Sequence, residues 1–72
     1  MIFCDLGALL ARRNLTLTDV YRDTGISRTT LTTLKKNKAQ GIRFSTLETL
    51  CNYLDCSVSD ILIHVPQRGD FI

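Results

Sequence analysis

Apolar residues recur along this chain at steps of three and four, the spacing that places side chains on one face of an α-helix. Five segments show the pattern, and we expect helices at residues 2–13, 16–24, 27–36, 45–54 and 57–63. Residues 37–44 are predicted to form a loop. Residues 61–65 are rich in β-branched side chains, so a short strand there is an alternative to the end of the last helix. The pattern predicts one all-α domain over residues 1–66, followed by a tail at 67–72.

Start and stop signals are clearest around the second and third predicted helices. Thr16 is a favourable N-cap residue, and Asp19 follows at the spacing of a capping box. Gly25 can take the left-handed conformation that ends a helix, and Ser27 can cap the next one. The capping-box spacing recurs later in the chain, at Ser45 with Glu48 and at Ser57 with Asp60. Residues 16–37 therefore predict a helix, a tight turn and a second helix.

The predicted helix 27–36 has a polar outward face. Leu31 and Leu34 form its inward stripe, and the opposite side carries short hydroxyls framed by cations: Arg28, Thr29, Thr32, Thr33 and Lys36. Such a face suits contact with phosphates and base edges. A polar face that is simply solvated is the commoner reason for this pattern, so spacing alone leaves both interpretations open.

The charge of the chain is small but unevenly placed. The formal net charge is +2. Residues 28–43 carry five cations and no acid, residues 1–27 balance to zero, and residues 44–72 carry an excess of acids. A cationic segment opposite an acidic one indicates an oriented approach to an anion.

The reactive side chains predict no catalytic or metal chemistry. Cys4, Cys51, Cys56 and the single His64 show neither metal-ligand spacing nor a disulfide framework. No carboxylate pair and no nucleophile with a base is suggested, so we expect neither an enzyme nor a cofactor. There is also no signal peptide and no apolar run long enough for a membrane. We expect reduced thiols in a cytoplasmic protein without a membrane partner.

Together these residues resemble the Cro/C1-type helix-turn-helix family, also called the XRE family, over residues 6–66. The resemblance in the helical hairpin is carried by Thr16, Val20, Gly25, Ile26, Ser27, Leu31 and Leu34. The stretch GIRFSTLETLCNYLDCSVSDILIHVP, residues 41–66, resembles a compact subgroup of phage and bacterial regulators. The resemblance implies an all-α, five-helix, lambda-repressor-like domain with the helix-turn-helix at helices two and three. Tyr21 departs from the pattern, because the family usually has alanine there. Either the two helices splay, or the ring lies over the edge of the hairpin.

For function, the resemblance implies a sequence-specific, Cro-like transcriptional regulator whose third helix enters the major groove of an operator in double-stranded DNA. Base contacts are implied for Arg28, Thr29, Thr32 and Thr33, and a phosphate or base contact for Ser27. Lys36, on the same face, is implied as a DNA contact without a more specific role. Phosphate contacts are implied at the start of the second helix and in the loop, for Thr16, Thr18, Asn37, Lys38 and Arg43. The alternative is a small phage modulator or antirepressor that binds a partner repressor protein through the same face.

One such domain covers about half of an operator, so tight binding implies a homodimer. Apolar residues near the C-terminus are candidates for its interface: Ile61, Ile63, Val65, Phe71 and Ile72. The alternative for these side chains is that they complete the core of the monomer.

Overall fold

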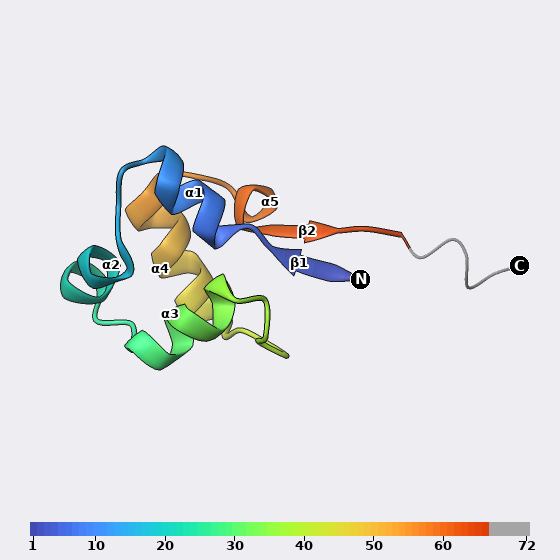
Figure 1. The fold of residues 1–72 in the computed structure, drawn as a ribbon, viewed down its shortest axis with the longest axis horizontal. Helices are drawn as coiled ribbons and strands as arrows, with labels where there is room; N and C mark the ends of the chain where they lie inside the picture. The colour runs from blue at the N-terminus through green and yellow to red at the C-terminus, as the bar shows by residue number, and fades with distance from the viewer. Residues whose placement is uncertain (67–72) are drawn as a thin grey trace, which may run out of the picture.

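A computed structural model describes residues 1–66 as five helices and a two-stranded sheet (Figure 1). In chain order the elements are β1 (Ile2–Cys4), α1 (Leu6–Arg12), α2 (Leu17–Thr24), α3 (Arg28–Lys35), α4 (Phe44–Leu54), α5 (Val58–Ile61) and β2 (Leu62–His64). The five predicted helices and the hairpin of α2 and α3 are confirmed. The tail at 67–72, with the interface candidates Phe71 and Ile72, lies outside the described residues.

The sheet corrects the prediction of an all-α fold. Strand β1 pairs antiparallel with β2, with Phe3 opposite Ile63 in the register. The helix predicted from residue 2 is wrong in its first turn, because Ile2–Cys4 is a strand and α1 begins at Leu6. The helix predicted to run to Ile63 ends at Ile61, where the β-branched run supplies the partner strand. Figure 1 shows the two strands projecting from the helices at the end opposite to α2.

The core is built almost entirely from aliphatic side chains of all five helices. Its buried members are Cys4, Leu6, Leu9, Leu10, Val20, Leu31, Leu34, Leu47, Leu50, Leu54 and Ile61. Within residues 1–66 no polar or charged residue is buried, so the core carries no desolvated polar group that needs a partner. Ile61 is fully covered. It therefore completes the monomer core, and its prediction as a dimer-interface residue is wrong.

The helical hairpin begins and ends where the sequence predicted. The Thr16 hydroxyl accepts a hydrogen bond from the Asp19 N–H at 3.2 Å, and the Asp19 carboxylate accepts from the Thr16 N–H at 2.9 Å. Gly25 ends α2 in the left-handed region with φ +76°. The Ser27 hydroxyl caps α3 by accepting from the Thr30 N–H at 3.2 Å. These local bonds fix both ends of the turn that orients α3.

The start of α4 differs from the prediction. The helix begins at Phe44, its N-cap is Arg43, and no side chain caps it, so the predicted capping box of Ser45 with Glu48 is wrong. The reason is that the N-cap lies two residues earlier than predicted, at Arg43, which places Ser45 inside the first turn. At α5 the predicted pairing of Ser57 with Asp60 is present, since the Asp60 carboxylate accepts from the Ser57 N–H at 3.0 Å.

Candidate nucleic-acid interface

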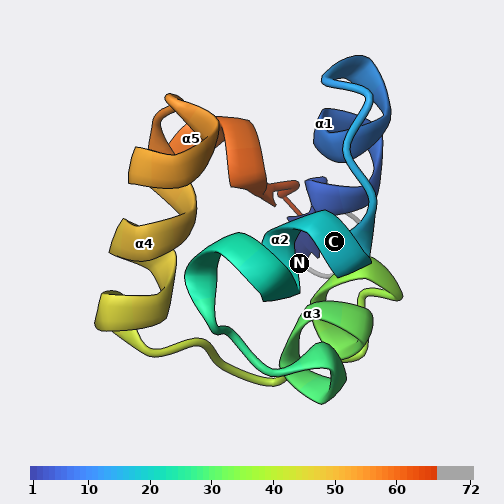
Figure 2. The ribbon, with the colours of Figure 1, turned by 90° about the vertical axis from the view of Figure 1, so that its left-hand side faces the viewer.

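Helix α3 presents its hydroxyls and cations away from the core, as its sequence pattern predicted. Leu31 and Leu34 anchor it among the buried leucines. Figure 2 shows α3 below α2, with α4 to the left of both helices. On the outward face Arg28, Thr29 and Lys36 are exposed, whereas Thr32 and Thr33 are partly covered. The structure therefore brings these five predicted contact residues together on one accessible face.

The turn between α2 and α3 is held by a side chain of its own. The Thr24 hydroxyl donates to the carbonyl of Val20 at 2.6 Å and accepts from the N–H of Ile26 at 3.2 Å. Ile26 is partly buried against the core. One hydroxyl therefore links the last turn of α2 to the connecting segment, which sets the direction in which α3 leaves the turn.

The acids closest in sequence to this face are engaged elsewhere. Arg22 forms salt bridges with Asp19 at 3.2 Å and with Asp23 at 3.0 Å. Asp23 accepts hydrogen bonds from Arg22 and from the Tyr53 hydroxyl, and these bonds lower the pKa of its carboxyl, the Arg22 bond more strongly. The bond from Tyr53 is 2.6 Å long, and it raises the pKa of the Tyr53 hydroxyl. Within residues 1–66 no salt bridge involves a cation of α3 or of the following loop. The positive charge of that segment is therefore not neutralised by nearby carboxylates.

A hydroxyl-lined hollow of about 560 Å³ lies between the hairpin turn and the start of α4. Its lining includes Ser27, Thr30, Arg43 and Thr46. Ser27 is the N-cap of α3 and Arg43 is the N-cap of α4, so two helix N-termini border the hollow. Helix N-termini carry unpaired N–H groups and partial positive charge, which favour an anion such as a phosphate.

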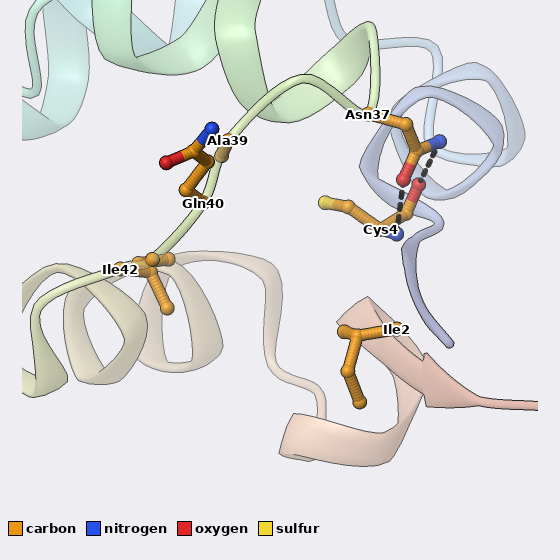
Figure 3. Close-up of a pocket in the computed structure, with 7 residues that line it drawn as sticks. Ile2, Cys4, Asn37, Ala39, Gln40 and Ile42 are labelled. Atoms are coloured by element: carbon orange, nitrogen blue, oxygen red, sulfur yellow. Dashed lines mark hydrogen bonds between the residues drawn. The ribbon is translucent and has the colours of Figure 1, made fainter.

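The remaining predicted phosphate contacts lie at the start of α2 and in the loop after α3. Thr16 and Thr18 are exposed at the first turn of α2, and Lys38 is exposed in the loop after α3. Asn37 lies beside Lys38 but has a structural role. Its amide nitrogen donates to the carbonyl of Cys4 at 3.1 Å, and its amide oxygen accepts from the Cys4 N–H (Figure 3). Both halves of the Asn37 amide are therefore already bonded to β1.

Asn37 also borders a hollow of about 280 Å³ that is lined mainly by aliphatic carbon. Figure 3 shows that the side chains around it come from β1 and from the loop after α3. Asn37 itself has φ +59°, a left-handed conformation that asparagine tolerates better than most residues. The sequence indicated a turn at this position. It gave no signal for the bond to a strand 33 residues earlier.

Tyr21 forms a contact that sequence reasoning did not name. The guanidinium carbon of Arg28 lies over the Tyr21 ring, 4.9 Å from its centre, and Tyr21 is 42% exposed. The ring is therefore partly exposed and lies beside the first residue of α3. The departure of Tyr21 from the family pattern was the signal that pointed here.

Burial disfavours the reactive thiolate form at two of the three cysteines. Cys4, Cys51 and Cys56 are free thiols, and burial raises the pKa of both the Cys4 and the Cys56 thiol. In the described part of the chain no group of three His, Cys, Asp or Glu side chains gathers as metal ligands would. None of the helices within residues 1–66 is long and apolar enough to cross a membrane.

Comparison with known proteins agrees with this geometry. The Cro/C1-type HTH DNA-binding domain family matches residues 5–67. The uncharacterized HTH-type transcriptional regulator YozG of Bacillus subtilis (strain 168) is 39% identical over 61 residues, which cover 85% of this chain and 73% of the relative. A family of DNA-binding domains is not a family of enzymes, so the prediction that this chain is not an enzyme is confirmed. The match runs from the start of α1 to beyond β2, and the chain belongs to the Cro/C1-type helix-turn-helix family of DNA-binding proteins.

Proposed function

We propose that this protein is a Cro-like transcriptional regulator that binds a specific double-stranded DNA site with α3 in the major groove. The observation that carries the proposal is the outward face of α3, which is accessible, rich in hydroxyls and cations, and free of acids from Ser27 to Arg43. Local hydrogen bonds hold the turn that presents this face, because the Thr24 hydroxyl bonds both Val20 and Ile26 and the Ser27 hydroxyl caps α3. We place its action in the cytoplasm of a bacterial host cell.

Base reading is assigned to the outward face of α3. Arg28 is the longest donor there and suits the O6 and N7 acceptors of guanine. Thr29, Thr32 and Thr33 have short side chains that suit single hydrogen bonds or contact with a thymine methyl. The Thr33 hydroxyl donates to the Thr29 carbonyl at 2.7 Å, so its oxygen remains an acceptor. With one long reader per domain, discrimination per monomer is modest.

Phosphate binding is assigned to the residues on either side of that face. The uncapped N-terminus of α4 and Arg43 form one contact, with Ser27 across the same hollow. Lys36 and Lys38 contribute charge at the other end of α3, and the first turn of α2, with Thr16 and Thr18, contributes a further contact. Because the Asn37 amide is engaged with β1, we assign Asn37 the positioning of this loop in place of a direct side-chain contact.

A homodimer is part of the proposal, since one domain of this size reads about half of an operator. Ile63 and Val65 remain candidates for the interface, because they are 37% and 42% exposed. Ile63 lies in β2 and Val65 directly follows this strand, next to β1. In the same place Met1 and Ile2 are 57% and 65% exposed. An exposed apolar group at this place is consistent with a contact between two copies.

A second function is favoured by two exposed aromatic side chains. Phe44 is 88% exposed at the first residue of α4, and Tyr21 is 42% exposed beside α3. Aromatic residues are enriched where proteins contact proteins. These side chains suit a small phage modulator or antirepressor that docks on a repressor through the helix-turn-helix face. The cationic face would then meet an acidic surface of the partner.

The experiment that separates the two functions is selection of duplexes from a random DNA pool, followed by binding titrations at several salt concentrations. DNA reading predicts one enriched sequence and affinity that falls steeply with salt. Arg28→Ala is expected to relax the preference at one base pair, whereas Lys38→Ala weakens all duplexes alike. If both variants bind like the parent, the assignment of contacts is wrong. No DNA binding at low salt, together with a stoichiometric complex with a repressor encoded beside this gene, supports the modulator.

A further inference from the structure

The two arginines of the helical hairpin are held in different ways. Arg22 is held by carboxylates, since its guanidinium bonds both Asp19 and Asp23. Arg28, in contrast, has no salt bridge within residues 1–66 and lies over the ring of Tyr21. A carboxylate occupies the N–H donors around the edge of a guanidinium. An aromatic ring attracts the cation through its face and takes up none of those donors.

This difference decides what Arg28 is free to bind. Its guanidinium carbon is 4.9 Å from the centre of the Tyr21 ring, within the range of a cation–π contact. The arginine therefore has a defined position while its N–H groups remain available. A bidentate bond to the O6 and N7 atoms of guanine needs two such donors in one plane at a fixed orientation. A phosphate, in contrast, accepts a cation from many directions.

We propose that Tyr21 is a positioning residue for base recognition, holding Arg28 at the start of α3 so that it reads a guanine. The inference rests on the proposed function and deepens it. Tyr21 belongs to α2 and not to the helix that reads bases, so its effect on DNA passes through Arg28. We therefore expect it to contribute to sequence specificity more than to total affinity. The contact joins the last helical turn of α2 to the first residue of α3, and so makes the direction of Arg28 part of the folded hairpin.

The test uses the duplex that the parent protein enriches from a random pool, and the same duplex with each base pair replaced in turn. Tyr21→Ala introduces the residue that the family usually has, and Tyr21→Phe keeps the ring as the matched control. Each variant is also made with Arg28→Ala, all at one salt concentration. Circular dichroism checks that the variants fold. Tyr21→Leu, bulky but without an aromatic face, replaces the alanine variant if that variant is unfolded.

We expect Tyr21→Ala to lower the preference for guanine at the base pair that depends on Arg28 by about two- to fivefold, the size of an exposed cation–π contact. Tyr21→Phe retains the preference, and Tyr21→Ala has no effect on it once Arg28 is absent. The inference is overturned if Tyr21→Ala weakens all duplexes equally, or if its effect persists in the Arg28→Ala background. A parent protein that enriches no sequence overturns the proposed function itself, and the inference with it.

Discussion

Replacing Asn37 with glycine separates a structural role for this residue from a role in DNA binding. The Asn37 amide joins the end of α3 to the backbone of Cys4 in β1 through two hydrogen bonds. Glycine removes the amide but accepts the left-handed conformation at φ +59° without strain. The change therefore tests the two bonds and leaves the turn itself intact.

The expected cost follows from those bonds. Each contributes roughly 0.5–1.5 kcal/mol, and the Cys4 N–H and C=O are left without the partners that the structure gives them. We expect the free energy of unfolding of Asn37→Gly to fall by about 2 kcal/mol. For a domain of this size, that corresponds to a decrease in Tm of roughly 8–16 °C.

Asn14 supplies a matched control. It is also left-handed, with φ 56°, and no side-chain hydrogen bond to it is present in the described residues. Asn14→Gly has two opposing effects on stability. Glycine removes the strain of the left-handed conformation, which stabilises the folded state, but it raises the entropy of the unfolded chain, which stabilises the unfolded state. We expect a change within about 0.5 kcal/mol, so the difference between the two variants isolates the amide bonds.

Urea unfolding of both variants, followed by circular dichroism, measures this difference. DNA titrations of folded Asn37→Gly then measure its salt dependence. We expect lower stability with an unchanged salt slope, because no phosphate contact is lost. Equal stability of the two glycine variants, with a smaller salt slope for Asn37→Gly only, would refute the structural assignment and restore Asn37 as a phosphate contact.

Three further changes test the hairpin and its ends. Gly25→Ala should cost about 1–2 kcal/mol in urea unfolding, since φ is +76° there, while Gly41→Ala, in open space without a left-handed φ, should be neutral. Asp19→Asn should unfold with a lower free energy than the parent at neutral pH, because the hydrogen bonds from Thr16 favour the charged Asp19 carboxyl and lower its pKa. The difference in stability between the variant and the parent should shrink as acid protonates that carboxyl, and a difference that does not change with pH contradicts this. Tyr53→Phe should slightly lower Tm by removing the bond to Asp23, and an unchanged Tm shows that the bond contributes nothing.

Much of the hairpin could be predicted because its determinants are local. Thr16 and Asp19 cap α2 from three residues apart, and Gly25 ends it with the conformation that glycine favours. The outward face of α3 follows from its helical period, since Leu31 and Leu34 fix which side is buried. These signals need no knowledge of the rest of the chain.

The sheet could not be predicted in the same way. Ile2 and Phe3 continue the three-and-four spacing of α1, so periodicity alone assigned them to that helix. They form a strand because Leu62–His64, about sixty residues later, supplies the partner backbone. A strand of three residues has little stability without such a partner. Its existence is therefore a property of the tertiary fold.

Two features of the candidate site were missed for the same reason. The bond from Asn37 to Cys4 depends on where β1 lies, and β1 was not expected. The contact between Tyr21 and Arg28 joins two helices across the turn, so it depends on their crossing. Residue spacing within one helix gave no information about either contact.

The most direct test of the central claim is the equilibrium binding of the parent protein to its enriched duplex and to a scrambled duplex over a series of salt concentrations. We predict that the logarithm of the affinity falls linearly with the logarithm of the salt concentration, by about 0.9 for each phosphate contacted. The enriched duplex should bind more tightly at every concentration, because α3 reads bases as well as charge. Affinity that is independent of salt, or equal for the two duplexes throughout, would contradict the account.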